Sequence, residues 1–388
     1  MINLSYSIGV PDKTRIIWAD VEEIKAELDR FVKAKFTDRI SVLVILGDYG
    51  TGKTHSLNYI RHSSQNLQKV KLKIIVFEHP FENFIVFLEK IEEFLPLEET
   101  CAIVKRSITK RKSQITKLFK KGYDEDIIDS VMVFEKAHDL VLKSMYPQMC
   151  SDLRTILARI LTTESKEIFD LAKKWLRGVS LTPTQLRDLG VTGKISISNA
   201  PDISADYLRI YLSDGGCLLL LIDEFEDLGD IGDKPSLVSF RHYLDENLPR
   251  TKMVVTMTDD AFEGLRTGKK VFMRKSYVPL WSRFNTSKKL RLSNLNQENS
   301  KLFLTDYLTS LNRNLKNKIE IESNALQRIY RHTNGSPRLL SVIAEYLCSM
   351  SKFDGRLDDK TVSVVVDYLE LKIRTEKASE AERVSPKI

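Results

Sequence analysis

One segment constrains the fold more than any other: ILGDYGTGKTHSLNYI, from Ile45 to Ile60. Within it, Gly47, Gly52, Lys53 and Thr54 fit the spacing G-x-x-x-x-G-K-[ST]. A glycine-rich loop between a buried strand and a helix can turn its backbone N–H groups towards a polyphosphate, and the helix adds its positive N-terminal end. The pattern predicts a bound nucleoside triphosphate, but it does not say what the energy drives.

The loop residues give the expected cofactors, ATP and Mg²⁺. We expect Lys53 to reach the β and γ phosphates and Thr54 to bind the metal ion. The predicted nucleotide-binding residues run through the whole loop and include Gly47, Asp48, Tyr49, Gly50, Thr51, Gly52, Lys53, Thr54 and His55.

A second apolar run, CLLLLIDEFEDL, begins at Cys217 and ends in acids. A buried strand that delivers a carboxylate at its end suits Mg²⁺, so Asp223 is predicted to be the second metal ligand. Glu224 beside it would polarise the attacking water, and this acidic pair favours hydrolysis over transfer to a small acceptor. A solvated acid at a strand end is the alternative for Glu224. We expect Glu226 and Asp227 to be surface acids.

Apolar runs separated by helical periodicity predict the fold class: an α/β protein with a parallel P-loop sheet between helices. Strands are expected at 41–46, 73–78 and 217–222, within 252–260 and near 288–295. Little strand signal occurs from 100 to 212, which predicts a helical insertion, and a helical lid follows the sheet. The predicted divisions are 1–99 and 213–295 for the ATPase core, 100–212 for the insertion, 296–376 for the lid and 377–388 for a polar tail.

Composition indicates what kind of partner the protein binds and in which cellular compartment it lies. The 388 residues carry 60 Lys and Arg against 53 Asp and Glu, a formal charge of +7. This excess favours a polyanionic partner, although a merely soluble basic surface explains it equally well. The four cysteines form no CxxC pair, and the longest apolar run is too short to span a bilayer. Without a signal-peptide pattern, we expect a cytoplasmic protein that has no membrane segment.

Taken together, the two motifs resemble the AAA+ class of P-loop ATPases, over roughly residues 15–60, 70–95 and 215–375. The resemblance implies a polar sensor residue on the strand MVVTMTDD. Thr256 and Thr258 lie on one face of that strand. We favour Thr258, which is nearer the strand end, while an ordinary β-branched strand residue is the alternative for either.

Two arginines match further motifs of the class. PLWSRFN resembles the arginine-finger segment, so Arg283 would reach the γ-phosphate of a neighbouring subunit, with a local salt bridge as the alternative. TNGSPRLLSVIAEYL resembles the second sensor at the start of a lid helix, from which Arg338 would point to the phosphates. The resemblance therefore implies a homo-oligomer whose catalytic residues are Glu224, Thr258, Arg338 and, from the neighbour, Arg283.

Within the class, the late arginine and the lid motif resemble the origin-recognition/Cdc6-like group and the transposition ATPases. A finer similarity to the ATP-binding proteins of BREX-type phage-defence systems is carried by AKKWLRGVSLTPTQLRDLGV, Ala172 to Val191, and by the histidine after the P-loop threonine. Trp175 and Leu176 fit equally well as core residues of the insertion. The chain ends soon after the lid motif, so we do not expect the winged helix of most origin-recognition proteins.

Two basic stretches are candidates for contact with a phosphate backbone. They lie at 105–121 and 266–275, and a solvated surface is the alternative for each. The candidate residues are Lys105, Arg106, Lys110, Arg111, Lys112, Arg266, Lys269, Lys270, Arg274 and Lys275. Double-stranded DNA is the favoured partner, although the sequence does not separate DNA from RNA.

Two functions remain open at this point. The first is an oligomeric AAA+ ATPase that couples ATP binding and hydrolysis to DNA engagement or to remodelling of a DNA-associated complex, in genome maintenance or mobile-element defence. The alternative is a nucleotide-controlled interaction switch whose helical insertion docks a partner protein. A protein unfoldase is weaker, because no aromatic-hydrophobic-glycine loop follows the second strand.

Overall fold

The structure is a computed structural model that describes residues 22–65, 71–78, 83–110, 131–227, 234–246, 248–268, 277–311, 319–349 and 354–369. The chain divides into two compact units. Unit 1 takes in the segments 1–33, 47–62 and 290–388, and unit 2 takes in 34–46 and 63–289. The glycine-rich loop thus groups with the lid, whereas the acidic strand and the insertion share the other unit. The domain boundaries expected from the sequence stay a prediction.

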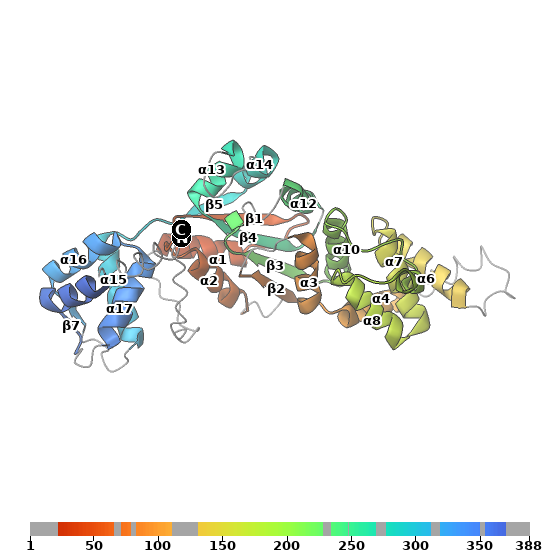
Figure 1. Cartoon of the computed structure of the whole chain (residues 1–388), viewed down its shortest axis with the longest axis horizontal. Helices are drawn as coiled ribbons and strands as arrows, with labels where there is room; N and C mark the ends of the chain where they lie inside the picture. The colour runs from red at the N-terminus through yellow and green to blue at the C-terminus, as the bar shows by residue number, and fades with distance from the viewer. Residues whose placement is uncertain are drawn as a thin grey trace, which may run out of the picture. The chain divides into compact units, whose positions relative to one another are not determined.

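A five-stranded sheet has the order β2-β3-β4-β1-β5 (Figure 1). The strands are β1 Ser41–Leu46, β2 Leu72–Phe77, β3 Cys217–Ile222, β4 Thr251–Met257 and β5 Lys288–Arg291. The pairings of β1 with β4, β4 with β3 and β3 with β2 are all parallel. All residues of β3 and β4 are buried, as expected of strands covered on both faces. The predicted α/β class is confirmed.

Strand register brings the acids of β3 to a defined place on β4. Ile222, the last residue of β3, lies opposite Val255. Asp223 and Glu224 therefore leave the sheet beside Thr256, the next residue of β4. In an open parallel sheet, ligands bind outside the carboxyl ends of the strands. The acids that follow β3 stand at that edge.

Helices make up most of the rest of the described chain. In unit 2 they are α3 Phe84–Phe94, α4 Leu97–Lys110, α6 Val131–Met145, α7 Ser151–Thr163, α8 Lys166–Leu176, α9 Pro183–Leu189, α10 Ala200–Ser213, α12 Lys234–Asp245, α13 Asp259–Thr267 and α14 Val278–Thr286. Unit 1 holds α1 Glu22–Lys33, α2 Lys53–Gln65 up to His62, α15 Gln297–Leu311, α16 Ser323–Thr333 and α17 Pro337–Ser349. It also holds a two-stranded sheet of β6 Glu320–Ile321 and β7 Arg356–Leu357, which the sequence analysis did not predict.

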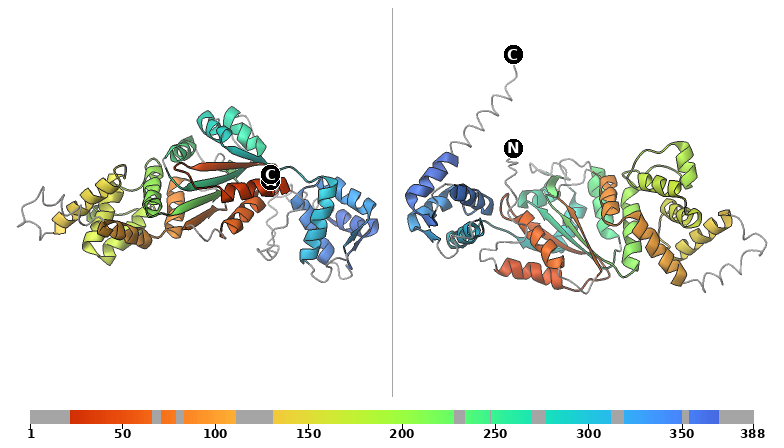
Figure 2. Two further views of the ribbon diagram at one scale, coloured as in Figure 1. Left: turned by 180° about the vertical axis from the view of Figure 1, so that it is seen from behind. Right: turned by 90° about the horizontal axis from the view of Figure 1, so that it is seen from below.

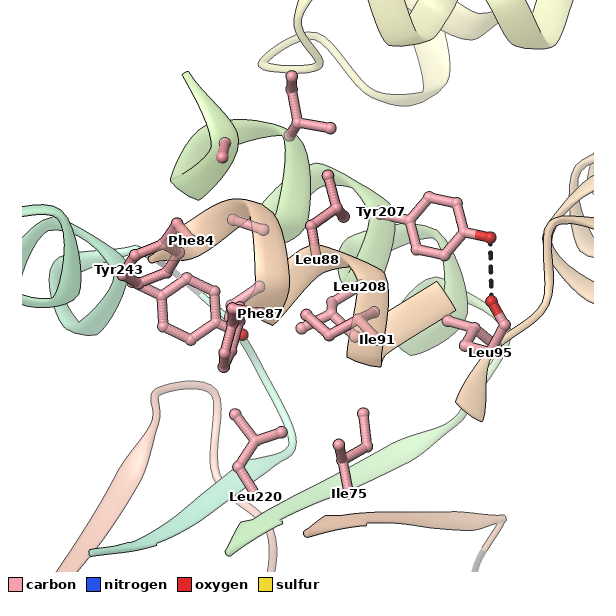
Figure 3. Packing of buried hydrophobic residues seen from close by; sticks show 14 of the residues in the cluster. Ile75, Phe84, Phe87, Leu88, Ile91, Leu95, Tyr207, Leu208, Leu220 and Tyr243 are labelled. Atoms are coloured by element: carbon pink, nitrogen blue, oxygen red, sulfur yellow. Dashed lines mark hydrogen bonds between the residues drawn. The ribbon is translucent and has the colours of Figure 1, made fainter. Parts of the chain in front are cut away.

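The core of unit 2 is continuous from the sheet into the helical insertion. Helix α3 packs between β2 and α10, and Figure 3 shows Phe84 and Phe87 of α3 facing Tyr243, with Ile91 near Leu208 of α10. Most of α10 is buried, so it forms the inner layer of the insertion. Figure 2 shows the remaining insertion helices, coloured orange to yellow-green, beyond α10 on the side away from the sheet. The insertion is integral to unit 2.

One helix of the insertion begins at a recognisable sequence signal. Helix α9 starts with a capping box, in which Thr182 accepts from the N–H of Gln185 and the Gln185 side chain accepts from the N–H of Thr182. Pro183 occupies its first turn, where a missing N–H costs nothing. No strand occurs between β2 and β3 within the described parts of 100–212, and the expected borders at 100 and 212 fall inside α4 and α10.

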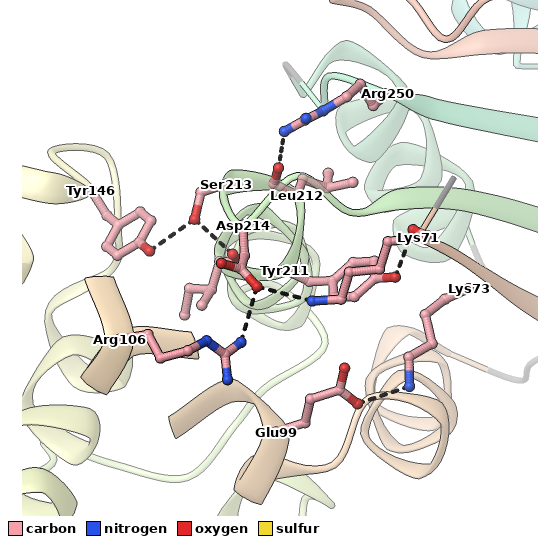
Figure 4. A network of polar contacts seen from close by, with 11 residues as sticks. Lys71, Lys73, Glu99, Arg106, Tyr146, Tyr211, Leu212, Ser213, Asp214 and Arg250 are labelled. Carbon is pink, nitrogen blue, oxygen red and sulfur yellow. Dashed lines mark hydrogen bonds and ion pairs between the residues drawn. The ribbon is translucent and has the colours of Figure 1, made fainter. Parts of the chain in front are cut away.

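A polar network fastens the insertion to the start of the sheet (Figure 4). Asp214, after α10, accepts from Lys71 at 2.9 Å and from Arg106 of α4 at 3.0 Å. The hydrogen bond from Lys71 lowers the pKa of the Asp214 carboxyl below its usual value, with Arg106 acting in the same direction. Tyr146 and Ser213 share a further bond of 2.9 Å. These contacts tie α4, α6 and α10 to the residue that leads into β2.

The lid has a hydrophobic core of its own, distinct from that of unit 2. Helices α15, α16 and α17 surround Leu304, Ile329 and Leu340, all fully buried. Asn334 caps the C-terminus of α16 with a left-handed φ of 48°, and Gly335 follows with φ 70°. A β-carbon on Gly335 would lie 1.9 Å from the carbonyl oxygen of Leu295, so only glycine fits there. This turn delivers Pro337 and Arg338 to the start of α17.

Candidate functional site

The glycine-rich loop in unit 1 has the backbone of a phosphate-binding loop. Gly50 and Gly52 take φ values of 82° and 101°, which residues with side chains rarely adopt. Lys53 begins α2 and is 7% exposed. Its ammonium nitrogen donates to the carbonyl oxygens of Gly47 at 2.8 Å and Asp48 at 3.1 Å, so the side chain folds back over the loop. The Lys53 ammonium group, which we expect to contact the phosphates, is thus held by two carbonyl oxygens of the loop.

The loop also meets a test of fit for a triphosphate. A β-carbon placed on Gly52 would meet nothing within 4 Å, so the loop borders open space where α2 begins. One placed on Gly47 would lie 2.6 Å from the hydroxyl oxygen of Thr51 and 2.8 Å from the carbonyl oxygen of Leu292. Glycine is therefore needed at position 47 for packing and at position 52 for conformation. Backbone N–H groups, a lysine and Thr54 form a donor set suited to phosphate with a magnesium ion.

The structure brings Arg338 of the lid to the loop. The N–H of Arg338 donates to the carbonyl oxygen of Gly50 at 3.3 Å. A β-carbon on Gly50 would lie 2.8 Å from the hydroxyl oxygen of Ser336 and 3.1 Å from the β-carbon of Arg338. Ser336, a loop neighbour that the sequence analysis did not identify, is 8% exposed. The start of α17 therefore packs directly on the loop.

In unit 2, Asp223 and Glu224 form a tight turn after β3. Asp223 is 5% exposed, and its N–H donates to the carbonyl oxygen of Phe77 at 3.0 Å. Glu224 takes a left-handed φ of 49°, which costs energy for a residue with a β-carbon. Its N–H donates to the Thr256 hydroxyl oxygen and to Oδ1 of Asp223, both at 3.1 Å. Such stored strain is characteristic of functional sites, where surrounding contacts hold it in place.

The two threonines considered for the sensor role have different partners. Thr256 is fully buried, and its hydroxyl donates to Oδ1 of Asp223 while accepting from the N–H of Glu224. Thr258 lies just after β4 and caps α13, accepting from the N–H of Ala261 at 3.1 Å. The preference for the position nearer the strand end overlooked this cap, because Thr258 followed by Asp259 and Asp260 is also a helix start signal.

One expectation about the acids is wrong. Glu226 is 1% exposed and not a surface acid. Helical geometry begins at this turn, where the N–H of Asp227 bonds to the carbonyl oxygen of Glu224 at 3.0 Å, and it turns the Glu226 side chain inward. The alternation expected from a strand end does not continue here.

Arg283 lies on α14 with about half of its side chain exposed. Its guanidinium donates to Oδ1 of Asp245, at the end of α12, and Arg241 donates to Oδ2 of the same carboxylate at 2.9 Å. The chain by itself therefore shows the local salt bridge that the sequence left open. An exposed guanidinium on a short helix is also what a finger for a neighbouring site requires.

The described candidate nucleic-acid residues lie on two helices, with Lys105, Arg106 and Lys110 on α4 and Arg266 on α13. Lys105 pairs with Glu164, Arg106 pairs with Asp214, and Arg266 pairs with Glu263. Lys110 is exposed at the end of α4. The remaining candidates lie outside the described residues: Arg111, Lys112, Lys269, Lys270, Arg274 and Lys275. Where the structure describes these stretches, it places three of the four candidate side chains in ion pairs.

Among known proteins, similarity to this chain is found in solved structures and not in sequence families. No protein-family model matches the sequence, and no curated protein matches it. Among solved structures, the chain is similar to the ORC2 protein of Aeropyrum pernix, solved as ADPNP-ADP complexes, with 14% identity over 89% of this chain and 67% of that one, at a TM-score of 0.46. It is also similar to a Walker-type ATPase of Pyrococcus abyssi, with 15% identity over 97% and 79% of the chains and a TM-score of 0.45.

A third similar structure is domain III of the replication initiation protein DnaA of Thermotoga maritima. It has 14% identity over 92% of this chain and 96% of that one, with a TM-score of 0.41. The chain's own sheet, with the glycine-rich loop after β1 and the acids after β3, is the arrangement that the resemblance to AAA+ P-loop ATPases implies. Across the described residues, no helix has the length and apolar character needed to cross a membrane.

The segment behind the finer resemblance to phage-defence proteins has a structural role. Trp175 is 1% exposed and donates from its indole nitrogen to the carbonyl oxygen of Gly193 at 2.9 Å, and Leu176 is fully buried. Arg177 donates twice to one carboxylate oxygen of the buried Glu92 on α3, at 3.0 and 2.8 Å. A β-carbon on Gly178 would lie 2.3 Å from a methyl carbon of Ile85. These contacts dock α8 on α3, and the finer resemblance stays a prediction.

Proposed function

We propose that this protein is an oligomeric AAA+ ATPase that couples ATP binding and hydrolysis to the engagement of DNA or to remodelling of a DNA-associated complex. The observation that carries the proposal is the turn after β3, where Thr256 holds Asp223 and a strained Glu224 at the carboxyl edge of the sheet. A carboxylate pair fixed in this way can serve as a metal ligand and as the base that orients water.

Each residue then has a role in the proposed reaction. The loop N–H groups and Lys53 hold the phosphates, and Thr54 and Asp223 hold Mg²⁺, which when bound neutralises charge on the transferred phosphoryl group. Glu224 positions the attacking water, and Thr256 keeps the Asp223 carboxylate and the Glu224 backbone oriented. We assign the sensor role to Thr256 in place of Thr258, because only Thr256 touches the acidic turn. Arg338 reaches the phosphates from the lid.

Steady-state hydrolysis with purified variants tests the enzymatic part. Lys53→Ala is expected to weaken ATP binding, and Glu224→Gln to leave binding intact while lowering kcat. Arg283→Ala should lower kcat by about a thousandfold, the scale of other arginine fingers, without changing nucleotide affinity. Mixing Arg283→Ala with Lys53→Ala subunits should restore part of the activity, because each supplies what the other lacks. Absence of rescue, with a monomer in solution under ATP, would remove the finger assignment.

The nucleic-acid part rests on the formal charge of +7 and on the two basic stretches. Binding of fluorescent duplex DNA, measured by anisotropy with ATP and Mg²⁺, should weaken steeply as salt increases, because phosphate contacts release counterions. Matched single-stranded DNA and duplex RNA distinguish the nucleic acids. A complete lack of binding at low salt would overturn this part and leave the ATPase part standing.

The continuous core of unit 2 favours one further function, a nucleotide-controlled switch in which the insertion docks a partner protein. Glu92 and Arg177 join α3 of the ATPase core to α8 of the insertion, so a change in α3 would be transmitted outwards. Deleting the insertion would expose the core, so surface substitutions are the better test. Lys136→Glu with Lys143→Glu, on the exposed side of α6, should abolish partner capture and spare DNA binding. The reverse result would contradict the switch.

A further inference from the structure

The acidic turn and the arginine-finger helix meet through two aromatic rings. Phe225 directly follows Glu224, and Phe284 directly follows Arg283. Their ring centroids are 5.3 Å apart with an interplanar angle of 86°, an edge-to-face contact. Phe240 of α12 touches both, at 4.9 Å from Phe225 and 6.3 Å from Phe284. All three rings are fully buried.

Phe225 is tied to the same strand residue that holds the acids. Its N–H donates to the carbonyl oxygen of Thr256 at 2.9 Å, while the Thr256 hydroxyl bonds to Asp223 and to the N–H of Glu224. The three residues of the turn therefore share one anchor. A displacement of the Asp223 carboxylate or of the strained Glu224 backbone is passed on to the Phe225 ring.

Phe284 in turn positions the helix that carries Arg283. Helix α14 has nine residues, and its fully buried side chains are Leu280 and Phe284. The Arg283 side chain is one residue away and faces solvent, where it contacts the Asp245 carboxylate. Because the helix is short, the packed position of the Phe284 ring fixes the direction in which the neighbouring Arg283 guanidinium points.

We propose that Phe225 and Phe284 are a positioning pair that links the state of a subunit's own ATP site to the finger it offers to the next subunit. The proposal rests on the proposed function and describes its regulation. Close-packed aromatic rings suit this task, because an edge-to-face pair has a preferred geometry and a packed core does not deform continuously. Neither residue touches substrate, so both act through Glu224 and Arg283.

A complementation experiment separates this role from simple stability. Arg283→Ala subunits keep an intact site but give no finger, and Glu224→Gln subunits give a finger but cannot hydrolyse ATP. In a mixture of the two, a complete site forms only where an Arg283→Ala subunit lies next to a Glu224→Gln subunit. The first subunit then supplies the intact ATP site and the second, which we call the donor, supplies the arginine finger. The donor subunits are then made with Phe225→Leu or Phe284→Leu in addition, and kcat and KM for ATP are measured on each mixture.

We expect either leucine substitution in the donor to lower the rescued kcat about fivefold, a rate effect of the size of one aromatic pair, with KM unchanged. The donor with both substitutions should lose little more than either single donor, because the two rings act as one contact. Equal rescue by donors with and without the leucines would overturn the positioning pair. No rescue even by the donor with intact rings would instead contradict the trans finger of the proposed function.

The control donor carries Phe87→Leu, which also removes a fully buried ring, one that packs on Phe77, Phe84 and Tyr243. It should rescue as well as the donor with all its rings intact. Thermal melts and sedimentation confirm that each donor is folded and assembles. If a leucine variant does not fold, Phe225→Met and Phe284→Met keep more of the volume and take its place, with the same expected loss of rescue.

Discussion

The hydroxyl of Thr256 bonds to the carboxylate of Asp223, across the neighbouring strands β4 and β3. The same hydroxyl oxygen accepts the N–H of Glu224, whose backbone is left-handed. One buried side chain therefore orients the proposed metal ligand and holds the strained backbone of the proposed base.

Substituting Thr256 and Thr258 separately should separate catalysis from stability. Thr256→Val keeps the shape but removes the hydroxyl, so kcat should fall by about a hundredfold, the scale for loss of one preorganised hydrogen bond at a reacting site. Thr258→Val should leave kcat near the wild-type value and cost about 1 kcal/mol of unfolding free energy, because it removes the cap of α13. Steady-state kinetics and urea unfolding of both variants test this prediction. A larger fall in kcat for Thr258→Val than for Thr256→Val would return the sensor role to Thr258.

Alanine substitutions at Gly50 and Gly52 should differ in how they affect the lid. Both impose a positive φ on alanine, which costs about 1–2 kcal/mol. At Gly52 the added methyl group meets open space, whereas at Gly50 it meets Ser336 and Arg338. Gly50→Ala should therefore destabilise the packing of α17 on the loop by about 1–3 kcal/mol more than Gly52→Ala.

Hydrogen exchange of the first turn of α17 measures this difference directly. Faster exchange in Gly50→Ala than in Gly52→Ala is the expected result. Equal exchange in the two variants would show that the lid does not depend on its contact with the loop.

The sequence predicted most of the sheet because its signals are local. The apolar runs of β1 and β3, and the glycine spacing at Gly47 and Gly52, need no knowledge of distant contacts. By contrast, the partner of Asp223 depends on the register between β3 and β4, which no local pattern encodes. The burial of Glu226 was missed because helical geometry begins at the turn after β3, where the N–H of Asp227 bonds to the carbonyl oxygen of Glu224. A cap signal, threonine followed by two aspartates, was available at Thr258 and would have moved the sensor assignment to Thr256.

The loop and the lid illustrate a second limit. The segment TNGSPRLLSVIAEYL drew attention to Arg338, but it gave no sign that Ser336 and the β-carbon of Arg338 would pack on Gly50. The β6–β7 sheet was also missed, because each strand has two residues and leaves no periodic signal. Contacts of this kind arise from tertiary packing, so they become visible only in the folded chain.

Breaking the ion pair between Arg177 and Glu92 should loosen the insertion. Glu92 is 2% exposed, so Arg177→Met would leave a buried carboxylate without its guanidinium. Because Arg177 is itself partly exposed, we expect a loss of about 1–3 kcal/mol, below the usual cost of breaking a fully buried pair. Lys174→Met, an exposed neighbour on α8, is the matched control and should change urea unfolding by less than about 0.5 kcal/mol.

The buried Lys252 should make stability depend on pH in the alkaline range. It is 2% exposed on β4, donates to the carbonyl oxygen of Ala34 at 2.6 Å and lies 4.4 Å from the ring centroid of Phe36. Burial lowers its pKa from the usual 10.5 to about 8. Between those values the unfolded chain binds more protons than the folded one, so this group's contribution to stability rises with pH. Below about pH 8 both states are protonated and the full penalty of burying the charge is present.

Lys252→Met isolates this contribution, because the buried tyrosines and cysteines that titrate at high pH are common to both proteins. At pH 7 the methionine variant should match or exceed the wild-type unfolding free energy, by up to about 3 kcal/mol. The difference between the two proteins should shift in favour of the wild type as pH rises from about 8 towards 10. Urea unfolding at pH 7, 8, 9 and about 10 measures the slope. A difference that is constant across this range would mean that the Lys252 ammonium keeps its ordinary pKa despite its burial.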